Sequence, residues 1–294
     1  MEHLVQTLVD AISVGSLYAL TALGIGLIFG VMRLINFAHG ELITFAAYAL
    51  LALFGLPVPV MLFGAMVVAV ALALIIERAA FRPLRSADPT TLLISSFAVS
   101  FFLQKLLILV VGSRLKGLDF LPALGRQIEV MGVRLQLLQI ATILVSAVVL
   151  VALTWFLRST RLGLQMRAAA EDFRMARVLG VRANRVISLA VLISGALAAV
   201  CAVMLTVSTP LVTPDFALRD TIVVLAGVVV GGLNRPIPAT LGGFAIGFAS
   251  GVLGGALPTD QTQYLPTFVF AAVILVLLVR PRGLFDFSRT VERV

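Results

Sequence analysis

Charged residues, cysteine and histidine are all scarce in this sequence of 294 residues. Only 12% of the residues are charged and 61% are hydrophobic, whereas a soluble domain is about a quarter charged and half apolar. A single cysteine, Cys201, excludes an intrachain disulfide. This cysteine and the two histidines, His3 and His39, supply too few ligands for a conventional metal site. The composition predicts an all-α, polytopic bundle of transmembrane helices.

Motifs for nucleotide hydrolysis and nucleophilic catalysis are also missing. A P-loop needs Gly-Lys-Ser/Thr, but the two lysines, Lys105 and Lys116, follow Gln104 and Leu115. There is no Gly-x-Ser-x-Gly nucleophile motif. We therefore expect no catalytic residue, metal or cofactor in this chain, and any ATP must be hydrolysed by another chain. Basic patches with interleaved aromatics are absent, so the expected partner is a lipid bilayer and not nucleic acid.

Hydrophobic runs long enough to approach the ~30 Å of a bilayer core recur along the whole chain. They occupy residues 8–31, 41–55, 58–77, 90–112, 136–157, 185–209, 219–233, 237–257 and 264–280. Runs 41–55 and 219–233 are short, which is typical of broken or re-entrant segments. The sequence predicts eight or nine spans in one membrane domain, 1–294.

Arginine distribution orients these spans. With nine spans, most of the 22 basic residues fall on one side of the membrane, including those of segment 158–185 and of the C-terminal tail. The positive-inside rule then places the N-terminus outside and the C-terminus in the cytoplasm. Segment 158–185 becomes a cytoplasmic loop. Segment 113–135 becomes an outer, periplasmic loop, in which alternating residues predict a short β-hairpin over 127–135.

Small residues recur every four positions in two of the predicted spans. Such rows let helix backbones approach closely where lipid removes the hydrophobic drive. The sequence favours internal helix packing over a subunit interface, without excluding the latter. The residues concerned are Gly26, Gly30, Gly243, Gly247, Gly251 and Gly255.

A polar interruption follows the first span at Asn36, His39 and Glu41. The sequence favours neither of two interpretations. The segment is either a cytoplasmic turn or a broken helix whose polar groups line a translocation path. The acidic residues that we expect within the spans are Glu41 and Glu77, both near predicted inner ends. Two acidic residues are few for a transporter coupled to protons or sodium.

The inward loop contains a predicted helix of about four turns, from Gly163 to Gly180. Small and apolar residues recur along one face, and Arg167 and Glu171 pair at i,i+4 on another. An amphipathic helix on lipid headgroups is one interpretation. Because the apolar face is narrow and rich in alanine, we favour a knob that fits a groove in another protein. The face consists of Met166, Ala169, Phe173, Ala176 and Gly180.

Several separated stretches resemble one protein family. They are GSLYALTALGIGLIFGVMRLINFAHGE, ERAAFRPLR, RAAAEDFRMARVLG, VVVGGLNRPIPATLGGFAIG and the ending RPRGLFD. In this order, over about residues 8–286, they are similar to the permease subunit of the bacterial high-affinity branched-chain amino acid ABC transporters. Departures lie at 42–48 and at 231–236.

The resemblance implies an importer subunit in the bacterial inner membrane. Its partners would be a second permease, homologous or identical, two cytoplasmic P-loop ATPases that bind ATP and Mg²⁺, and a periplasmic binding protein. The 163–180 segment would be the coupling helix, with Met166, Arg167, Glu171, Asp172, Phe173 and Gly180 at its contact with the ATPases. Branched-chain amino acids, urea, short amides or aromatic acids are the implied solutes. The alternative is a stand-alone secondary transporter or channel.

Overall fold

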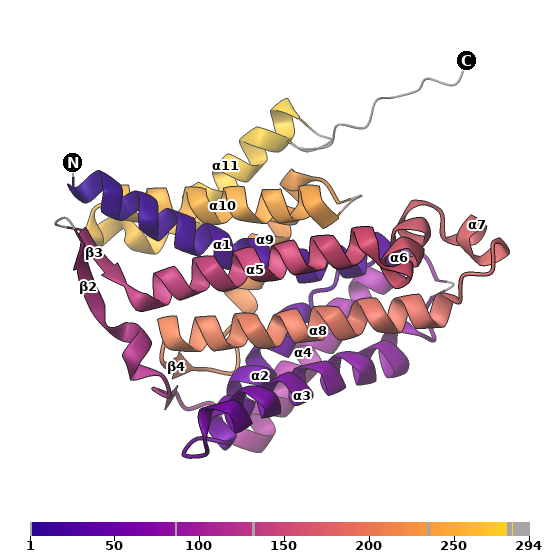
Figure 1. Ribbon diagram of the computed structural model, residues 1–294, viewed down its shortest axis with the longest axis horizontal. Helices are drawn as coiled ribbons and strands as arrows, with labels where there is room; N and C mark the ends of the chain where they lie inside the picture. The colour runs from indigo at the N-terminus through magenta and orange to yellow at the C-terminus, as the bar shows by residue number, and fades with distance from the viewer. Residues whose placement is uncertain (1, 86, 131–132, 234–235, 281–283, 285–294) are drawn as a thin grey trace.

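The computed structural model describes residues 2–85, 87–130, 133–233, 236–280 and 284. Over these residues the chain is a bundle of long helices with two small β-ribbons (Figure 1). The elements are α1 (Glu2–Met32), α2 (His39–Ala52), α3 (Val58–Ile76), the π-helical turn η1 (Glu77–Phe81), α4 (Pro89–Val111), β1 (Lys116–Gly117), η2 (Pro122–Gly125), β2 (Gln127–Val130), β3 (Val133–Gln136), α5 (Leu137–Ser159), α6 (Arg161–Glu171), α7 (Phe173–Val178), α8 (Ala183–Ser208), β4 (Leu211–Val212), α9 (Leu218–Gly231), α10 (Pro236–Ala256), η3 (Thr259–Tyr264) and α11 (Leu265–Val279).

Seven helices in the described part of the chain are long and apolar enough to cross a membrane. They begin in α1, α3, α4, α5, α8, α10 and just before α11. The two runs that the sequence marks as short form α2 and α9, each of 14 residues. A helix of that length extends about 21 Å, which is less than the bilayer core. Both are therefore partial helices, and each follows a non-helical stretch.

The long helices run side by side between two distinct ends (Figure 1). The β2–β3 hairpin and the N-terminus lie at one end, here called the hairpin end. Helices α6 and α7 lie at the other, here called the α6–α7 end. The hairpin that the alternation predicts is present, with Ile128 opposite Leu135 in an antiparallel register. A second ribbon pairs β1 with β4.

Helices α1 and α8 form the centre of the bundle, and α3, α4, α5 and α11 lie outside them with large apolar side chains exposed. Phe63, Leu109, Val148 and Leu278 are each more than half exposed. Water would disfavour such faces, whereas lipid tails accommodate them. The segregation of buried and exposed apolar faces agrees with a multi-pass membrane protein.

The glycine row of α10 lies against α1. A Cβ added to Gly247 would lie 2.8 Å from the Cα of Gly15 and 2.9 Å from the carbonyl oxygen of Val14, both closer than atoms normally approach. Gly243, Gly251 and Gly255 are equally tight against Tyr18, Ala11 and Thr7, and Gly26 meets Ala239. Gly30 is different, because a Cβ there would make only ordinary contacts at 3.8 Å or more. The row packs helices within one chain.

Candidate functional site

The polar interruption after α1 is buried inside the protein. Asn36, His39 and Glu41 are 3%, 0% and 1% exposed. The chain leaves α1 through Arg33, which has a φ of 54°, runs on without helix, and resumes as α2 at His39. This geometry favours the broken helix over the turn on the surface. Unwound backbone between helices is tolerated at membrane depth only where protein or a cavity surrounds it.

Side chains complete the hydrogen bonding of this break. The Asn36 Oδ1 accepts from the Ala38 N–H at 3.1 Å, which forms an Asx turn immediately before α2. Ser96 of α4 accepts from the Phe37 N–H at 3.4 Å and donates to the Ile35 carbonyl at 2.9 Å. The break is therefore held in one conformation by α4. At its start, the Arg33 guanidinium donates to the Ala170 carbonyl of α6 at 2.9 Å, which links the break to the α6–α7 end.

His39 and Glu41 point to different neighbours. The His39 Nδ1 lies 3.2 Å from the hydroxyl of Ser194 on α8, and Gly24 of α1 leaves room for the imidazole ring. Glu41 accepts a hydrogen bond from the Ser100 hydroxyl of α4 at 3.0 Å through Oε1. The remaining atoms, His39 Nε2 and Glu41 Oε2, are buried and have no hydrogen-bond partner in the described part of the chain. Buried polar atoms without partners are uncommon and call for a functional or solvent explanation.

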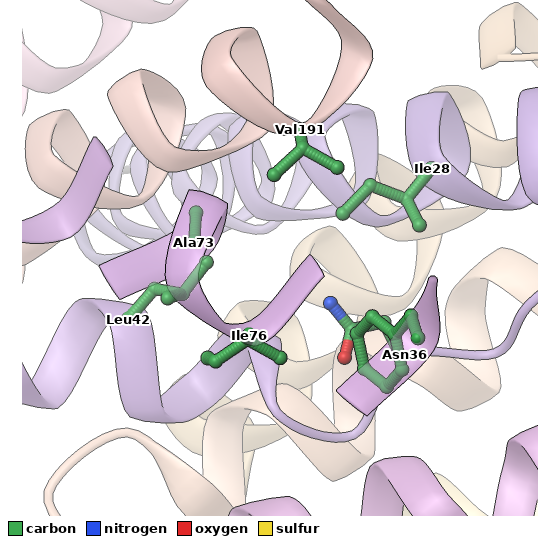
Figure 2. Close-up of a pocket in the computed structure, with 7 residues that line it drawn as sticks. Ile28, Asn36, Leu42, Ala73, Ile76 and Val191 are labelled. Atoms are coloured by element: carbon green, nitrogen blue, oxygen red, sulfur yellow. The ribbon is translucent and has the colours of Figure 1, made fainter. Parts of the chain in front are cut away.

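A small cavity adjoins the break (Figure 2). It has a volume of about 10 Å³, which is room for roughly one water molecule, and Asn36 supplies its polar wall. Apolar side chains from α1, α2, α3, η1 and α8 form the rest. In this conformation the region next to the break is closed to anything larger. The apolar lining is Ile28, Leu42, Ala73, Ile76, Phe81 and Val191.

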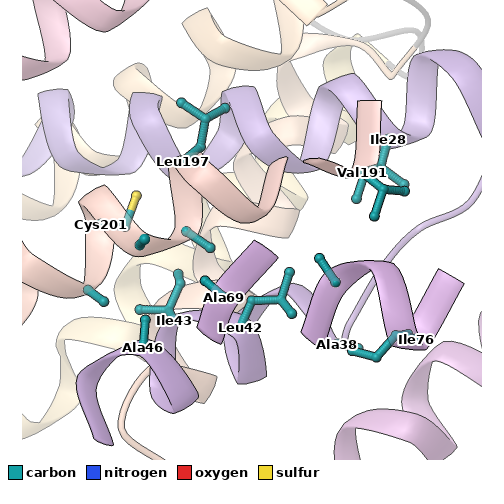
Figure 3. Close-up of a cluster of buried hydrophobic side chains, with 14 of the residues drawn as sticks. Ile28, Ala38, Leu42, Ile43, Ala46, Ala69, Ile76, Val191, Leu197 and Cys201 are labelled. Carbon is teal, nitrogen blue, oxygen red and sulfur yellow. The ribbon is translucent and has the colours of Figure 1, made fainter. Parts of the chain in front are cut away.

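Apolar packing holds α2 against both α3 and α8, which also contact each other (Figure 3). Leu42 and Ile43 of α2 lie in one buried cluster with Ala69 and Ile76 of α3 and Val191 of α8. Small side chains dominate the surroundings, so the backbones of the three helices approach closely. The polar residues of α2 are thereby held at fixed depth in the bundle.

The N-terminal ends of the two partial helices meet, although more than 170 residues separate them. The Thr44 hydroxyl of α2 accepts from the Ala217 N–H just before α9, at 3.3 Å. A Cβ on Gly40 would lie 2.6 Å from the Thr221 hydroxyl of α9, so glycine permits this approach. Partial helices that point their N-termini at one another near mid-membrane are the form that substrate sites take in many transporters. We call the meeting point the α2–α9 junction.

The junction contains an acidic residue that the sequence analysis missed. Asp220, in the first turn of α9, accepts a hydrogen bond from the Tyr18 hydroxyl of α1 at 2.9 Å. Asp10 likewise lies in α1 and bonds to Gln139 of α5. The expectation that Glu41 and Glu77 are the acidic residues of the spans was therefore wrong. Asp10 and Asp220 stand near the first residues of their predicted spans, where an acidic residue is easily taken for a flank.

Glu77, the other expected intramembrane acid, is buried and forms an ion pair with the partly exposed Arg85. Arg85 also donates to the Asn184 side chain at 2.6 Å, at the first turn of α8. The pair therefore ties η1 at the end of α3 to α8, close to the α6–α7 end. A π-helical turn of this kind is rare and often marks a functional position.

The inward segment differs from the expected single helix. Asp172 ends α6 and caps α7, because its carboxylate accepts the Met175 N–H at 2.9 Å. Gly163 lies inside α6, which begins instead at the Thr160 cap, whereas Gly180 ends the segment with a φ of 87°. An Asp side chain competes with the helix for backbone N–H groups, which explains the break.

The apolar face of this segment points into the bundle. Met166 is 2% exposed, and Phe173 is partly buried against the core. Arg167 and Glu171 lie on the exposed side of α6, where Arg167 reaches the Arg158 carbonyl at 3.5 Å. The exposed apolar side chains belong to the α7 region, where Met175, Val178 and Leu179 are 55%, 81% and 77% exposed. The expectation that Met166 forms part of an outward knob is wrong.

No cluster of three metal-ligating side chains occurs among the described residues. The RPRGLFD ending lies largely outside the described residues, and so does Arg235 of the 231–236 departure. The functional geometry of the described chain therefore centres on the α2–α9 junction and the exposed α7 region.

Comparison with known proteins gives a consistent result over nearly the whole chain. Residues 7–278 match the family model described as the branched-chain amino acid transport system permease component. The chain is 37% identical to the high-affinity branched-chain amino acid transport system permease protein BraD of Pseudomonas aeruginosa, covering 96% of this chain and 95% of that protein. It is 33% identical to the high-affinity branched-chain amino acid transport system permease protein LivH of Escherichia coli, covering 96% of this chain and 95% of that protein.

Among solved structures, PsaBC from Streptococcus pneumoniae in complex with Fab aligns with a TM-score of 0.52 at 13% identity. The alignment covers 96% of this chain and 93% of that one, so the likeness extends over the whole fold. Together with the family match across residues 7–278, these relatives show that the chain belongs to the family of branched-chain amino acid transport system permease components.

Proposed function

We propose that this chain is the permease subunit of an ATP-driven importer that moves branched-chain amino acids across the bacterial inner membrane. The whole-length likeness to BraD and LivH carries the proposal. The α2–α9 junction supports it, because crossed partial helices supply polar groups at a fixed depth between helices. The chain itself does not hydrolyse ATP. ATP and Mg²⁺ bind in partner chains.

The chain crosses the membrane nine times if the seven long helices are joined by two further crossings, each made of a partial helix, α2 or α9, and the non-helical stretch before it. The N-terminus then lies outside with the hairpin end, and α11 returns the chain to the cytoplasm. This arrangement puts the arginines of α6, α7 and their flanks inside, as the positive-inside rule requires. The hairpin end, with its two β-ribbons, becomes the docking surface for a periplasmic binding protein. A second permease, identical or homologous, completes the membrane domain.

The exposed α7 region is the contact for the two ATPases. Val178 and Leu179 are large apolar side chains that project from a short helix rich in arginine, and a groove on a partner would remove them from water. Behind them, Ala176 and Met166 are buried against the bundle. Movement of the ATPases would therefore be passed to α8 and, through Arg33, to the break before α2.

Reconstitution tests the function directly. The chain would be purified in mild detergent from its native membrane with its bound partners, placed in proteoliposomes and supplied with the binding protein. We expect uptake of radiolabelled leucine, isoleucine and valine that requires ATP and the binding protein, with little uptake of urea or acetamide. Accumulation of leucine by the chain alone, driven by a proton or sodium gradient without ATP, would instead establish a secondary transporter.

A further inference from the structure

One face of α2 presents two buried polar atoms that have no hydrogen-bond partner among the residues that the structure describes. They are the Oε2 atom of Glu41 and the hydroxyl of Tyr48, whose residues are 1% and 7% exposed. Seven positions separate Glu41 from Tyr48, which places both on one side of the helix two turns apart. Thr44 lies between them on the same side. The face therefore carries a row of three oxygen-bearing side chains.

The segment before α9 covers this face. Its anchor is the hydrogen bond from the Ala217 N–H to the Thr44 hydroxyl, which fixes the turn at 214–217 beside the middle of the row. Asp215 belongs to that turn and is exposed, and it precedes by two residues the Ala217 that bonds to Thr44. The turn follows β4, which lies toward the hairpin end (Figure 1). A row of acceptor groups thus leads from an exposed carboxylate to a buried one.

The chemistry of this row specifies its ligand. A carboxylate accepts hydrogen bonds only, and a phenol hydroxyl both accepts and donates, so Glu41, Tyr48 and Asp215 together offer acceptors to a cationic donor. A primary ammonium has three donors and no acceptor, and it neutralises the carboxylate that it meets. A metal ion is a poorer candidate, because the described residues contain no cluster of three metal-ligating side chains. Urea and aromatic acids carry no positive charge.

We propose that Asp215, Tyr48 and Glu41 are successive contacts for the α-ammonium group of the transported amino acid along this face of α2, with Asp215 at the entrance and Glu41 at the buried end. The site rests on the proposed function and narrows it, since it favours amino acids over the uncharged and anionic solutes of related permeases. Ser100 is a positioning residue, because its hydrogen bond to Oε1 leaves Oε2 available.

The test uses variants that remove an unpartnered atom from the reconstituted complex. Tyr48→Phe deletes only the free hydroxyl, and Glu41→Gln removes the charge while keeping an oxygen for Ser100. We expect the initial rate of leucine uptake to fall about tenfold or more in Glu41→Gln and about threefold in Tyr48→Phe, as for charged and neutral hydrogen bonds. Thermal stability should stay equal or rise in Tyr48→Phe, because that hydroxyl has no hydrogen-bond partner within the described ranges.

Ser146→Ala provides the matched control. The Ser146 hydroxyl is also buried with no partner among the described residues, but it lies on α5, which packs on α1 and α8. Wild-type uptake in Ser146→Ala with reduced uptake in Tyr48→Phe supports the site. Equal uptake by the wild type, Glu41→Gln and Tyr48→Phe overturns it, and so does an equal loss in Ser146→Ala.

Asp215→Asn keeps the proposal testable if Glu41→Gln does not fold. Because Asp215 is exposed, its contribution should be partly screened, so we expect a loss of uptake that shrinks as salt is raised. A loss that is independent of salt, or no loss at all, counts against Asp215 as the entrance. Failure of the wild-type complex to import leucine would refute the proposed function itself, whereas import that is insensitive to these variants refutes only the ammonium site.

Discussion

Adding one methyl group at Gly247 tests whether the glycine row of α10 is required for the contact with α1. In Gly247→Ala the new Cβ would lie 2.8 Å from the Gly15 Cα, 2.9 Å from the Tyr18 Cβ and 2.9 Å from the Val14 carbonyl oxygen. Carbon atoms normally pack at about 3.5–4.0 Å. Two of the three neighbours are backbone atoms, which cannot rotate away, so the helices must separate.

The expected cost follows from these distances. Forcing extra volume into a packed interior destabilises by about 1–3 kcal/mol. For a chain of roughly this size, about 2 kcal/mol lowers the melting temperature by roughly 4–8 °C. Gly254→Ala is the matched control on the same helix, because its Cβ would meet only the Leu265 Cδ2, at an ordinary 3.8 Å. There the better helix propensity of alanine should leave stability equal or slightly higher.

Thermal unfolding of both variants in the same detergent, followed by loss of the monodisperse peak in size-exclusion chromatography, measures the difference. We expect Gly247→Ala to melt several degrees below Gly254→Ala. If the two variants melt together, within about 1 °C of the wild type, the α1–α10 contact is not close-packed as described, and the row serves another purpose. A loss in Gly254→Ala alone would place the critical contact on the other face of α10.

Three further outcomes are expected. Arg85→Leu leaves the 2% exposed Glu77 carboxylate without its arginine partner and should destabilise the protein by about 1–3 kcal/mol in thermal unfolding. Arg78 is exposed, so Arg78→Leu should not destabilise it, and equal melting of the two variants would contradict a structural ion pair. Leu179→Asp should preserve insertion and melting temperature but abolish ATP-driven uptake, and normal uptake in this variant would remove α7 from the ATPase contact. Phe173→Asp should abolish uptake and also lower stability, because Phe173 packs on the core. Cysteines introduced at Ile128 and Val178 should react with a membrane-impermeant maleimide from opposite sides of the membrane, with little background from the buried Cys201. Labelling of both cysteines from the same side would refute the topology.

The long helices could be predicted closely from the sequence. The runs 58–77, 90–112 and 237–257 correspond to α3 with the start of η1, to α4 and to α10, each within one or two residues at both ends. Length and hydropathy are local properties, and a bilayer imposes the same minimum length on every span. The shortness of 41–55 and 219–233 likewise pointed to partial helices, because a run's length can be counted without knowing its neighbours.

The helical breaks were harder to predict. Met166, Phe173 and Ala176 do share one face, as the spacing suggested, but the direction of that face depends on what lies beneath it. The carboxylate of Asp172 caps α7 and so separates it from α6. Such a cap stabilises a helix start by only about 1 kcal/mol, so it competes weakly with continuation of the preceding helix. Such small local differences are settled by packing.

The sequence by itself determined that this is a helical membrane protein of the permease family, since composition, run lengths and motifs are properties of the chain. The burial of Asn36, His39 and Glu41, the contact of Thr44 with Ala217, and the absence of partners for Glu41 Oε2 and the Tyr48 hydroxyl among the described residues emerge only from the three-dimensional packing. The contacts join segments far apart in the chain, such as Glu41 with Ser100 and Thr44 with Ala217. No local propensity encodes such contacts, because each is fixed by the mutual packing of several helices.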